Sequence, residues 1–515
     1  MPPKIHAFLI SEQQHRFLHP ERDIKKDIQG IYTQGRILVG RSKRYSKISE
    51  NFVRPNTGSV VGAALGDEGK GRIIDNKIGA FFSKPNIKTV TVIRFQGGTN
   101  SGHTVEVKNI HLALHQIPCG IMYKHTTCIM DRGMTISPVD LIDEIHTVER
   151  IAGSLNGKLF LSPDAVLDTD LDRAEEFLNR IRQGKAGGGT GRGIGPSYAH
   201  HYDRLGFHVS DLMGDSWKEK LSVQYERYHR EFALYGLMLS TIDCGADFKK
   251  NKLMKKGRKR PVGSKETFLR RLAGARKELC ARQMVRNIFP MHKKIYEDPS
   301  CAVLFEGAQA LGLHPWLGTI PDITASDTST FGVQPGTGFW KAQDIEERIG
   351  VFKIPYTSSV GARHMPTEAT NDWAGRVRDE AHEYGTTTGR PRDILYLDLA
   401  MLGYNIRMSG IELLAGTHLD IAWEDIPIKV CTHYVDKQGD YVPYQPGLVY
   451  LADVIPQYVE LPGWSGNEVR RARSFKQLPV NAKKFLAFIQ RRLATPIIAV
   501  TTGPARENYL EISSF

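Results

Sequence analysis

The sequence predicts an α/β fold in which one large domain is built around a central, mostly parallel sheet. Short apolar runs have the composition of strands and end in polar or glycine loops, at 89–95, 301–307 and 495–503. Helical periodicity appears between and around them, without an internal repeat, at 138–153, 170–183, 216–238 and 265–290. This alternation assigns residues 59–515 to a single α/β domain, preceded by an N-terminal extension at 1–58.

The composition is that of a globular protein, with 41% hydrophobic and 24% charged residues among 515. No apolar run reaches the length of about eighteen residues that a membrane helix needs, and the N-terminus lacks the pattern of a secretory signal. The six cysteines form no CxxC pair and no zinc-like spacing, which suits a reducing compartment. We therefore expect a cytoplasmic protein with no membrane segment.

The net charge of +13 is concentrated in two segments. One is the extension 1–58, and the other is a basic insertion at about 245–265, in which "KKNKLMKKGRKRPVGSK" spans 249–265. Blocks of like charge usually remain solvated, so we expect surface segments with an accessory role. A patch for nucleic acid or an acidic partner, and a localisation signal, remain open, although no interleaved aromatic residues support RNA recognition.

The first glycine-rich loop, "GAALGDEGKG" at 62–71, follows a short apolar strand that begins near Ser59. It resembles a Walker A phosphate loop only weakly, because its glycines are two residues further apart and Gly71 stands where a Ser or Thr should follow Lys70. Asp67 and Glu68 are unexpected in an anion site unless one of them binds a metal ion or removes a proton. A plain glycine turn remains the alternative.

Further loops carry the same kinds of donor groups. "RFQGGTNSGHTV" at 94–105 follows the predicted strand 89–95 and contains His103, a candidate general acid. Glycine- and threonine-rich loops also occur at 187–198, 305–329 and 383–393. In the last of these, Arg390 and Arg392 can bind carboxylate or phosphate through paired hydrogen bonds. Ligands collect beyond the carboxyl ends of strands in such sheets, so we expect one anion-rich site built from many loops.

Seven short motifs stand in the order found in the adenylosuccinate synthetase family, which the chain resembles over essentially all of 59–515. They are "GDEGKG", "QGGTNSGHT", "TGRGIGPSY", "FEGAQ", "VGARHMPTE", "GTTTGR" and "LPGW". The resemblance implies a P-loop-like, GTPase-type ligase fold. It implies a reaction that joins L-aspartate to C6 of IMP through a 6-phosphoryl intermediate, with GTP as co-substrate and Mg²⁺ as cofactor. It also implies a homodimer.

The resemblance further implies a set of site residues. The catalytic residues are Asp67 as base, His103 as proton donor and Lys70 on the γ-phosphate. GTP is bound by Gly66, Glu68, Gly69, Lys70, Gly71, Gly102, Thr104, His418, Asp420, Thr501, Thr502 and Gly503. IMP is bound by Asn100, Thr190, Arg204, Gln309, Thr324 and Arg390, with Arg204 reaching across the dimer. The substrate aspartate is bound by Thr386, Thr387, Thr388, Arg390 and Arg392. Magnesium is held by Asp67 and the carbonyl of Gly102.

The chain departs from the family at several positions. Leu65 replaces a common Trp, and His314 and Trp316 stand where carboxylates are usual. His418 replaces the lysine of the guanine-recognition "TKLD" motif, and Ala505 replaces an Asp. GTP remains favoured, because Asp420 can still accept hydrogen bonds from the N1–H and 2-amino groups of guanine.

Three alternatives remain open: ATP as the donor, a related ligase acting on a purine such as dGMP, and a catalytically impaired nucleotide-binding regulator. Asp67 argues against the dGMP ligase, because relatives of that kind lack this residue. The motif residues Asp67, Lys70, His103 and Arg390 argue against the regulator.

Overall fold

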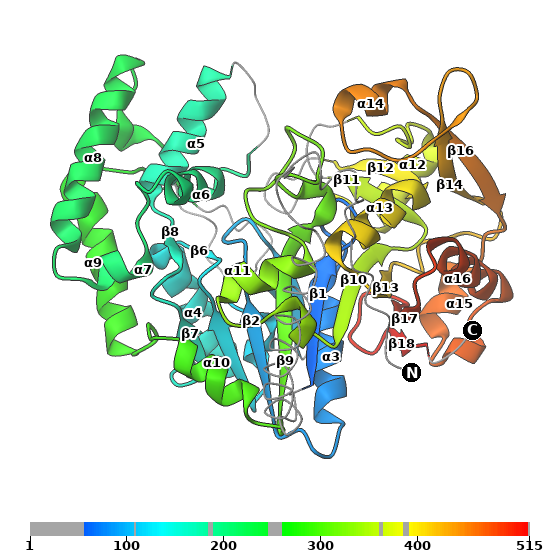
Figure 1. Cartoon of the computed structure of the whole chain (residues 1–515), viewed down its shortest axis with the longest axis horizontal. Coiled ribbons are helices and arrows are strands. Elements are labelled where there is room, and N and C mark those ends of the chain that lie inside the picture. The colour runs from blue at the N-terminus through cyan, green and yellow to red at the C-terminus, as the bar shows by residue number, and fades with distance from the viewer. Residues whose placement is uncertain are drawn as a thin grey trace, which may run out of the picture. The chain divides into compact units, whose positions relative to one another are not determined.

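A nine-stranded sheet lies at the centre of the computed structural model, which describes residues 56–107, 110–183, 189–245, 260–359, 364–384 and 391–512 (Figure 1). Its strands, in spatial order, are β18 (Tyr509–Glu511), β17 (Ile497–Thr501), β13 (Leu413–Thr417), β10 (Glu347–Lys353), β1 (Thr57–Gly62), β9 (Cys301–Ala310), β2 (Thr89–Arg94), β5 (Thr126–Met130) and β7 (Leu159–Leu161). Every neighbouring pair is parallel except β17 and β18. The predicted α/β fold with a mostly parallel central sheet is confirmed.

Both faces of the sheet are covered, as a parallel sheet requires. Val60 and Val61 are successive residues of β1, so their side chains point to opposite faces, and each belongs to a different core cluster. Ile74 and Phe81 of α3 (Lys70–Phe82) pack in the cluster of Val60. Leu402 of α13 (Leu399–Ser409) and Phe485 of α16 (Val480–Leu493) pack in the cluster of Val61.

The chain changes direction across the sheet at β1. From β1 it runs through β2, β5 and β7 on one side, returns to β9 beside β1, and then fills the other side through β10, β13 and β17. Loops that follow these parallel strands therefore emerge along one edge of the sheet. An edge where the strand order reverses is the usual place for a ligand in open α/β sheets.

Smaller elements flank the central sheet. A second sheet contains β11 (Tyr356–Ser359), β12 (Asp393–Asp398), β14 (Ile428–Val435), β15 (Tyr441–Val442) and β16 (Ile455–Leu461). Two strand pairs are formed by β3 (His103–Val107) with β4 (Ile110–Leu114), and by β6 (Thr135–Ile136) with β8 (Val166–Leu167). The remaining α-helices are α4 (Pro138–Ala152), α5 (Asp170–Arg182), α6 (Ile194–Tyr202), α7 (Val209–Met213), α8 (Trp217–Leu234), α9 (Lys265–Ala281), α10 (Phe289–Tyr296), α11 (Val333–Thr337), α12 (Asp372–Glu380), α14 (Leu448–Asp453) and α15 (Gly466–Arg471). Figure 1 shows α5, α6, α8 and α9 grouped on the side of the sheet away from β14 and β16.

The predicted strands correspond to β2, β9 and β17, and the first three predicted helices correspond to α4, α5 and α8. The fourth predicted helix, 265–290, is too long. It ends at Ala281, because Gln283 adopts a left-handed conformation with φ 52° and Val285 then pairs with Leu161. None of the helices among the described residues is long and apolar enough to cross a membrane.

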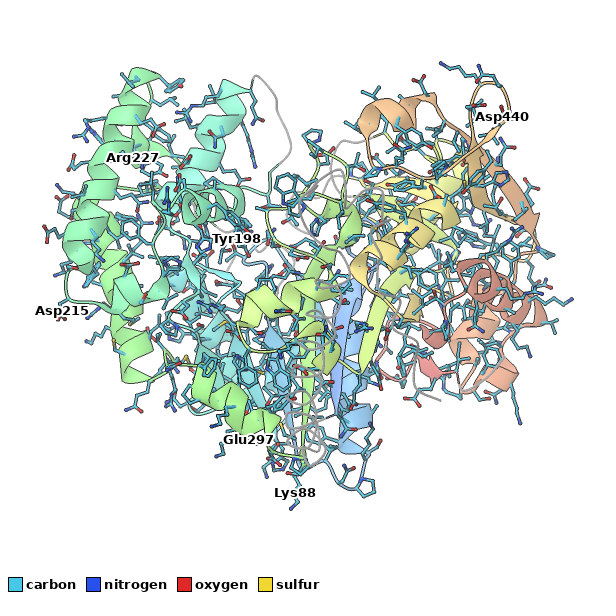
Figure 2. All side chains as sticks on the ribbon, in the orientation of Figure 1. Lys88, Tyr198, Asp215, Arg227, Glu297 and Asp440 are labelled. Atoms are coloured by element: carbon cyan, nitrogen blue, oxygen red, sulfur yellow. The ribbon has the colours of Figure 1, made fainter. Side chains whose placement is uncertain are left out.

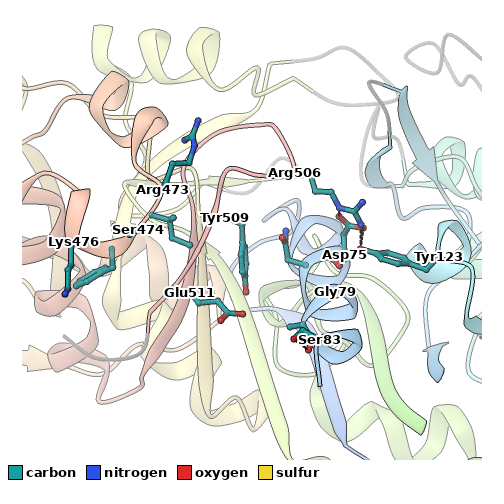
Figure 3. Close-up of a pocket in the computed structure, with 14 residues that line it drawn as sticks. Asp75, Gly79, Ser83, Tyr123, Arg473, Ser474, Lys476, Arg506, Tyr509 and Glu511 are labelled. Atoms are coloured by element: carbon teal, nitrogen blue, oxygen red, sulfur yellow. Dashed lines mark hydrogen bonds and ion pairs between the residues drawn. The ribbon is translucent and has the colours of Figure 1, made fainter. Parts of the chain in front are cut away.

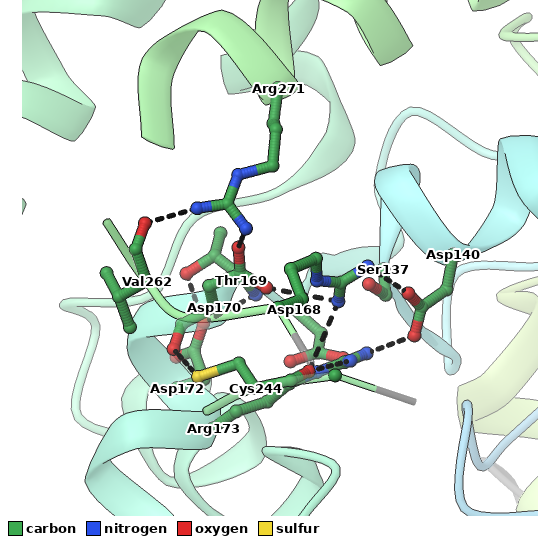
Figure 4. Close-up of polar contacts among 12 residues, drawn as sticks. Ser137, Asp140, Asp168, Thr169, Asp170, Asp172, Arg173, Cys244, Val262 and Arg271 are labelled. Carbon is green, nitrogen blue, oxygen red and sulfur yellow. Dashed lines mark hydrogen bonds and ion pairs between the residues drawn. The ribbon is translucent and has the colours of Figure 1, made fainter. Parts of the chain in front are cut away.

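A buried ion-pair network fixes the two ends of the basic insertion (Figure 4). Arg260 contacts Asp140 of α4 at 2.5 Å and Asp170 of α5 at 3.1 Å, and Arg173 contacts Asp140 at 2.7 Å. The amide of Cys244 donates to the carbonyl of Arg260 at 2.8 Å. Residues 246–259 and the extension 1–55 lie outside the described residues. The boundary of the extension at 58 stays a prediction, and chain contacts separate Met1–Arg54 from Pro55–Phe515.

Candidate active site

The loop between β1 and α3 is braced by its own acidic residue. One carboxylate oxygen of Glu68 accepts from the Gly66 amide at 2.7 Å, and the other contacts Lys70 Nζ at 2.9 Å. Glu68 and Lys70 are both buried, whereas Asp67 is exposed at the tip of the loop. Gly69 caps α3 with φ 86°, a conformation that glycine adopts without strain. The loop thus presents Asp67 outward and turns its phosphate-loop lysine toward Glu68.

His103 is held by a second buried carboxylate. The residue opens β3, and its Nδ1 lies 2.5 Å from Oε1 of Glu306 on β9. Glu306 also accepts from the Cys119 amide at 2.8 Å. Burial lowers the pKa of His103, and the negative charge of Glu306 opposes this shift. The contact at Nδ1 leaves Nε2 as the ring nitrogen available for proton transfer.

Three predicted IMP residues carry buried polar atoms without a partner. Within the described part of the chain, Asn100 Oδ1, Gln309 Oε1 and Thr324 Oγ1 make no hydrogen bond. Asn100 lies after β2, Gln309 is near the end of β9, and Thr324 lies in the segment after β9. A hydrogen bond from Ser326 to Gln96 at 2.7 Å and one from Gln96 to Ala308 O at 2.7 Å join these segments. Buried polar groups are normally paired, so these three atoms are candidates for contacts with a polar ligand, although unpaired buried atoms also occur elsewhere in the described chain, as at Ser59 and Arg348.

The predicted guanine end is formed by the loops after β13 and β17. Thr417 Oγ1 donates to the Glu68 carbonyl at 2.7 Å, which ties this end to the first loop. The amide of His418 donates to Thr501 Oγ1 at 3.2 Å. Burial and nearby Lys353 lower the pKa of His418 to about 4, so its ring is neutral at pH 7. Asp420 is buried and forms an ion pair with Arg470 at 2.9 Å.

Asp67 of the first loop forms an ion pair with Arg392, the residue directly before β12. The other terminal nitrogen of Arg392 contacts Glu383 at 2.7 Å, and Glu383 also pairs with the buried Lys353. Lys353 and Arg392 help to hold the pKa of Glu383 well below its usual range, against the opposing effect of burial. The predicted base and the predicted aspartate-binding arginine therefore belong to one charged cluster.

Other predicted residues are less closely joined to this centre. Three of them are exposed: Gly102, Thr190 and Arg204. Gly66 lies in the first loop and Gly71 in α3, and Thr502 and Gly503 follow β17. Thr104 is in β3, with its side chain outside the described part. Thr386, Thr387, Thr388 and Arg390 lie outside the described residues, so their predicted roles stay predictions.

Backbone strain marks several of the predicted residues. Seven non-glycine residues of the described chain have positive φ. Four of them are predicted site residues: Asp67 at 57°, Arg204 at 66°, Gln309 at 54° and His418 at 59°. Such conformations cost energy and gather where function requires a particular geometry.

A large cavity of the described structure lies elsewhere. It measures about 870 Å³, lies against α3 and β18, and is lined in part by the ion pair between Arg506 and Asp75 (Figure 3). Tyr123, Arg473 and Tyr509 also line it, and none of the predicted site residues does. The cavity therefore does not coincide with the residues predicted to form the site.

Comparison with known proteins identifies the family of the chain. The sequence pattern of the adenylosuccinate synthetase family matches residues 59–510. The chain belongs to this family. It is 33% identical over 454 residues to the adenylosuccinate synthetase of Syntrophomonas wolfei, covering 87% of this chain and 96% of the relative. It is 34% identical over 462 residues to that of a Thermoanaerobacter species, covering 88% and 99%.

Solved structures show the same architecture. The fully ligated adenylosuccinate synthetase of Plasmodium falciparum superposes with a TM-score of 0.76 at 29% identity, over 89% of this chain and all of the other. The succinoaminodeoxyadenylate synthetase of cyanophage S-2L, bound to dGMP and to dATP as energy donor, gives a TM-score of 0.52 at 15% identity, over 89% and 95%. This second likeness concerns the fold alone. The chain is a GTP-dependent ligase that joins L-aspartate to IMP, and the alternative functions are not favoured.

The structure shows the surroundings of His314, Trp316 and Leu65, three positions at which the chain departs from the family. His314 Nδ1 accepts from the amides of Trp316 at 3.1 Å and Leu317 at 3.2 Å, as a carboxylate oxygen could, while its Nε2 faces Asp327 at 3.2 Å. Trp316 itself is 85% exposed. Leu65 is fully buried in the core, where a Cβ built on Gly312 would lie 2.5 Å from it.

The sequence analysis assigned no role to Glu306, Glu383, Lys353 or Arg470, which contact predicted site residues directly or through one partner. Glu306 lies within the quoted "FEGAQ" motif, so an acidic residue in an otherwise apolar strand was a usable signal. Lys353 and Arg470 lie outside the motifs shared with the family. Glu383 lies at the start of the loop 383–393, where only the threonines and arginines were given roles. Their partners become visible only when the strands are assembled.

Proposed function

We propose that the loops at the carboxyl edge of the central sheet form the site at which this chain makes adenylosuccinate from IMP, L-aspartate and GTP. The observation that carries the assignment is the group of unpaired buried atoms on Asn100, Gln309 and Thr324. Hydrogen-bonding groups left without partners by the protein suit a nucleotide, which has many polar atoms. Asp67 and His103 come from loops of the same edge.

Asp67 is the base that removes the N1 proton of IMP and makes O6 nucleophilic. Its ion pair with Arg392 must loosen before the carboxylate can accept that proton, because a guanidinium contact favours the charged form. Arg392 is also the residue that we assign to the substrate aspartate. A carboxylate of aspartate would therefore compete with Asp67 for Arg392 and leave Asp67 free for IMP.

His103 donates a hydrogen bond from Nε2 to the phosphoryl group during transfer, held in position by Glu306. Lys70 neutralises the γ-phosphate, which requires it to exchange Glu68 for phosphate. The phosphorylated O6 then leaves as phosphate when the amine of aspartate attacks C6. Asp67 and the exposed carbonyl of Gly102 supply oxygen ligands of the kind that Mg²⁺ prefers, and the ion would neutralise the charge of the transferring phosphate.

We assign Arg204 to the IMP site of a partner subunit. Arg204 is exposed and held in a left-handed conformation at the end of α6, as a residue that reaches out of its own subunit would be. All six cysteines are free thiols, which supports a cytoplasmic location. A homodimer would then be needed for a complete site.

Phosphate release tests the assignment directly. The protein is mixed with Mg²⁺, aspartate and either GTP or ATP, and IMP, dGMP and GMP are compared as acceptors. We expect release with IMP and GTP. Phosphate release with dGMP but not with IMP would reject the proposal. So would the absence of release with all three purine nucleotides.

A pair of variants tests the base. Asp67→Asn should lower turnover by about 100-fold or more while GDP binding remains measurable. Asp215→Asn is the matched control, because Asp215 is an exposed aspartate before α8 (Figure 2). Retained turnover in Asp67→Asn would show that another group is the base.

A further inference from the structure

Asp420, the predicted acceptor for the donor base, is paired with a cation from another part of the chain. Arg470 Nε lies 2.9 Å from Asp420 Oδ2, and Arg470 Nη2 contacts Glu380 Oε1 at 2.6 Å. Asp420 is only 6% exposed, and Arg470 is the cation whose hydrogen bond and charge lower its pKa. We infer that Arg470 is a specificity-determining residue that makes the donor site select guanine over adenine. This inference rests on the proposed use of GTP.

The position of Arg470 is fixed by close backbone packing. The residue lies on α15, which follows the "LPGW" segment. Trp464 Nε1 donates to the carbonyl of Leu419 at 2.8 Å. A Cβ built on Gly466 would lie 2.1 Å from the carbonyl of Asp420, so only glycine allows this approach. α15 is therefore held against the loop that carries Asp420, and Arg470 reaches it from a rigid support.

The charge of Asp420 decides which base it can recognise. An ionised carboxylate accepts from both the N1–H and the 2-amino group of guanine. Adenine has no proton on N1 and no 2-amino group, so an ionised carboxylate meets a lone pair there. A protonated carboxyl group could instead donate to adenine N1. Selection of guanine thus requires Asp420 to stay ionised.

The contact with Arg470 favours the ionised form of Asp420. Burial raises the pKa of Asp420, and the nearby carboxylate of Glu380 raises it further, whereas the hydrogen bond and charge of Arg470 lower it. His418 lies two residues before Asp420, and its ring is neutral at pH 7 because its pKa is about 4. Arg470, on α15, therefore supplies the positive charge beside Asp420 that the neutral His418 does not.

Binding of GDP and ADP, measured by calorimetry with Mg²⁺ at pH 6 and pH 8, tests the inference without relying on turnover. The wild-type protein should prefer GDP at both pH values. Arg470→Gln should lose about 10- to 100-fold in GDP affinity at pH 6, the value of a hydrogen bond to a charged group, and less at pH 8. Its ADP affinity should not fall.

Two more variants separate charge from simple damage. Arg471→Gln removes an exposed arginine from the same helix and should keep the wild-type preference. Arg470→Lys keeps a positive charge and should retain most of the preference for GDP, and it remains informative if Arg470→Gln does not fold. A GDP-to-ADP ratio unchanged in Arg470→Gln at both pH values, or lost equally in Arg470→Lys and Arg470→Gln, overturns the inference.

The outcome is distinguishable from failure of the proposed function. A wild-type protein that prefers GDP and depends on Arg470 for it, but does not ligate IMP and aspartate, supports the inference and rejects the function. A wild-type protein that forms adenylosuccinate but binds ADP as tightly as GDP supports the proposed function and rejects the inference about Arg470.

Discussion

Glu306→Gln should slow catalysis while leaving the fold and the substrates' binding surfaces largely intact. The change preserves the size of the side chain and an acceptor for the Cys119 amide, but removes the charge 2.5 Å from His103 Nδ1. A hydrogen bond between a charged pair contributes about 1.5–3 kcal/mol, so turnover should fall by about 10- to 100-fold. KM values should change little, because Glu306 is fully buried behind His103.

The pH dependence gives the sharper test. Glu306 raises the pKa of His103 against the effect of burial, so its neutralisation should lower that pKa further. A proton donor is active only below its pKa, and the alkaline limb of the pH–rate profile should therefore move to lower pH.

The assay follows adenylosuccinate formation across pH 5.5–9, a range that includes the ordinary histidine pKa of about 6.5 and extends well above it. Glu144→Gln is the matched control: Glu144 is another buried glutamate, which accepts from the His115 amide at 2.7 Å and does not contact His103 in the described structure. Equal losses in both variants, or an unmoved alkaline limb in Glu306→Gln, would refute the role of Glu306.

Two further variants test other charged contacts. Arg392→Gln should raise the KM for aspartate by about 10-fold or more with a smaller effect on IMP, as measured by steady-state kinetics; an unchanged aspartate KM would remove Arg392 from that subsite. His200 lies between Asp172 and Glu175, whose hydrogen bonds raise its pKa to about 10. Protonated His200 therefore stabilises the folded state fully below about pH 6.5, and this contribution to the free energy of unfolding disappears as the pH rises toward 10. Urea unfolding should show His200→Gln less stable by about 2 kcal/mol at pH 6, with a gap that narrows at pH 9; a constant gap would contradict this.

The sequence was sufficient to predict the architecture because the parallel strands are nearly continuous apolar runs. β2, β9 and β17 are buried on both faces, so their composition differs clearly from that of the loops that follow. The end of α9 was not predictable in the same way. Gln283 is not a residue type that usually ends a helix, and its left-handed backbone depends on the pairing of Val285 with Leu161, which lies far away in the sequence.

The candidate site was predictable in its loops and less so in its contacts. The loops with Asp67 and His103 follow predicted strands, so the sequence placed both at one edge of the sheet, whereas His418 was assigned only through the resemblance to the family. The partners of these residues depend on strand register. His103 meets Glu306 across 203 positions of sequence, and Arg470 meets Asp420 across 50, distances over which local patterns carry no information.

The two ends of the basic insertion, near Asp243 and Pro261, are held together, and this allows the segment between them to vary in length. Asp243 pairs with Pro261, and the flanking residues are fixed by ion pairs to α4 and α5, so the segment leaves and re-enters the domain at a single point. The entropy of closing such a loop grows by only about 0.6 kcal/mol for each doubling of its length. Residues can thus be gained or lost between these two positions during evolution at little thermodynamic cost, with the catalytic loops kept apart from the change.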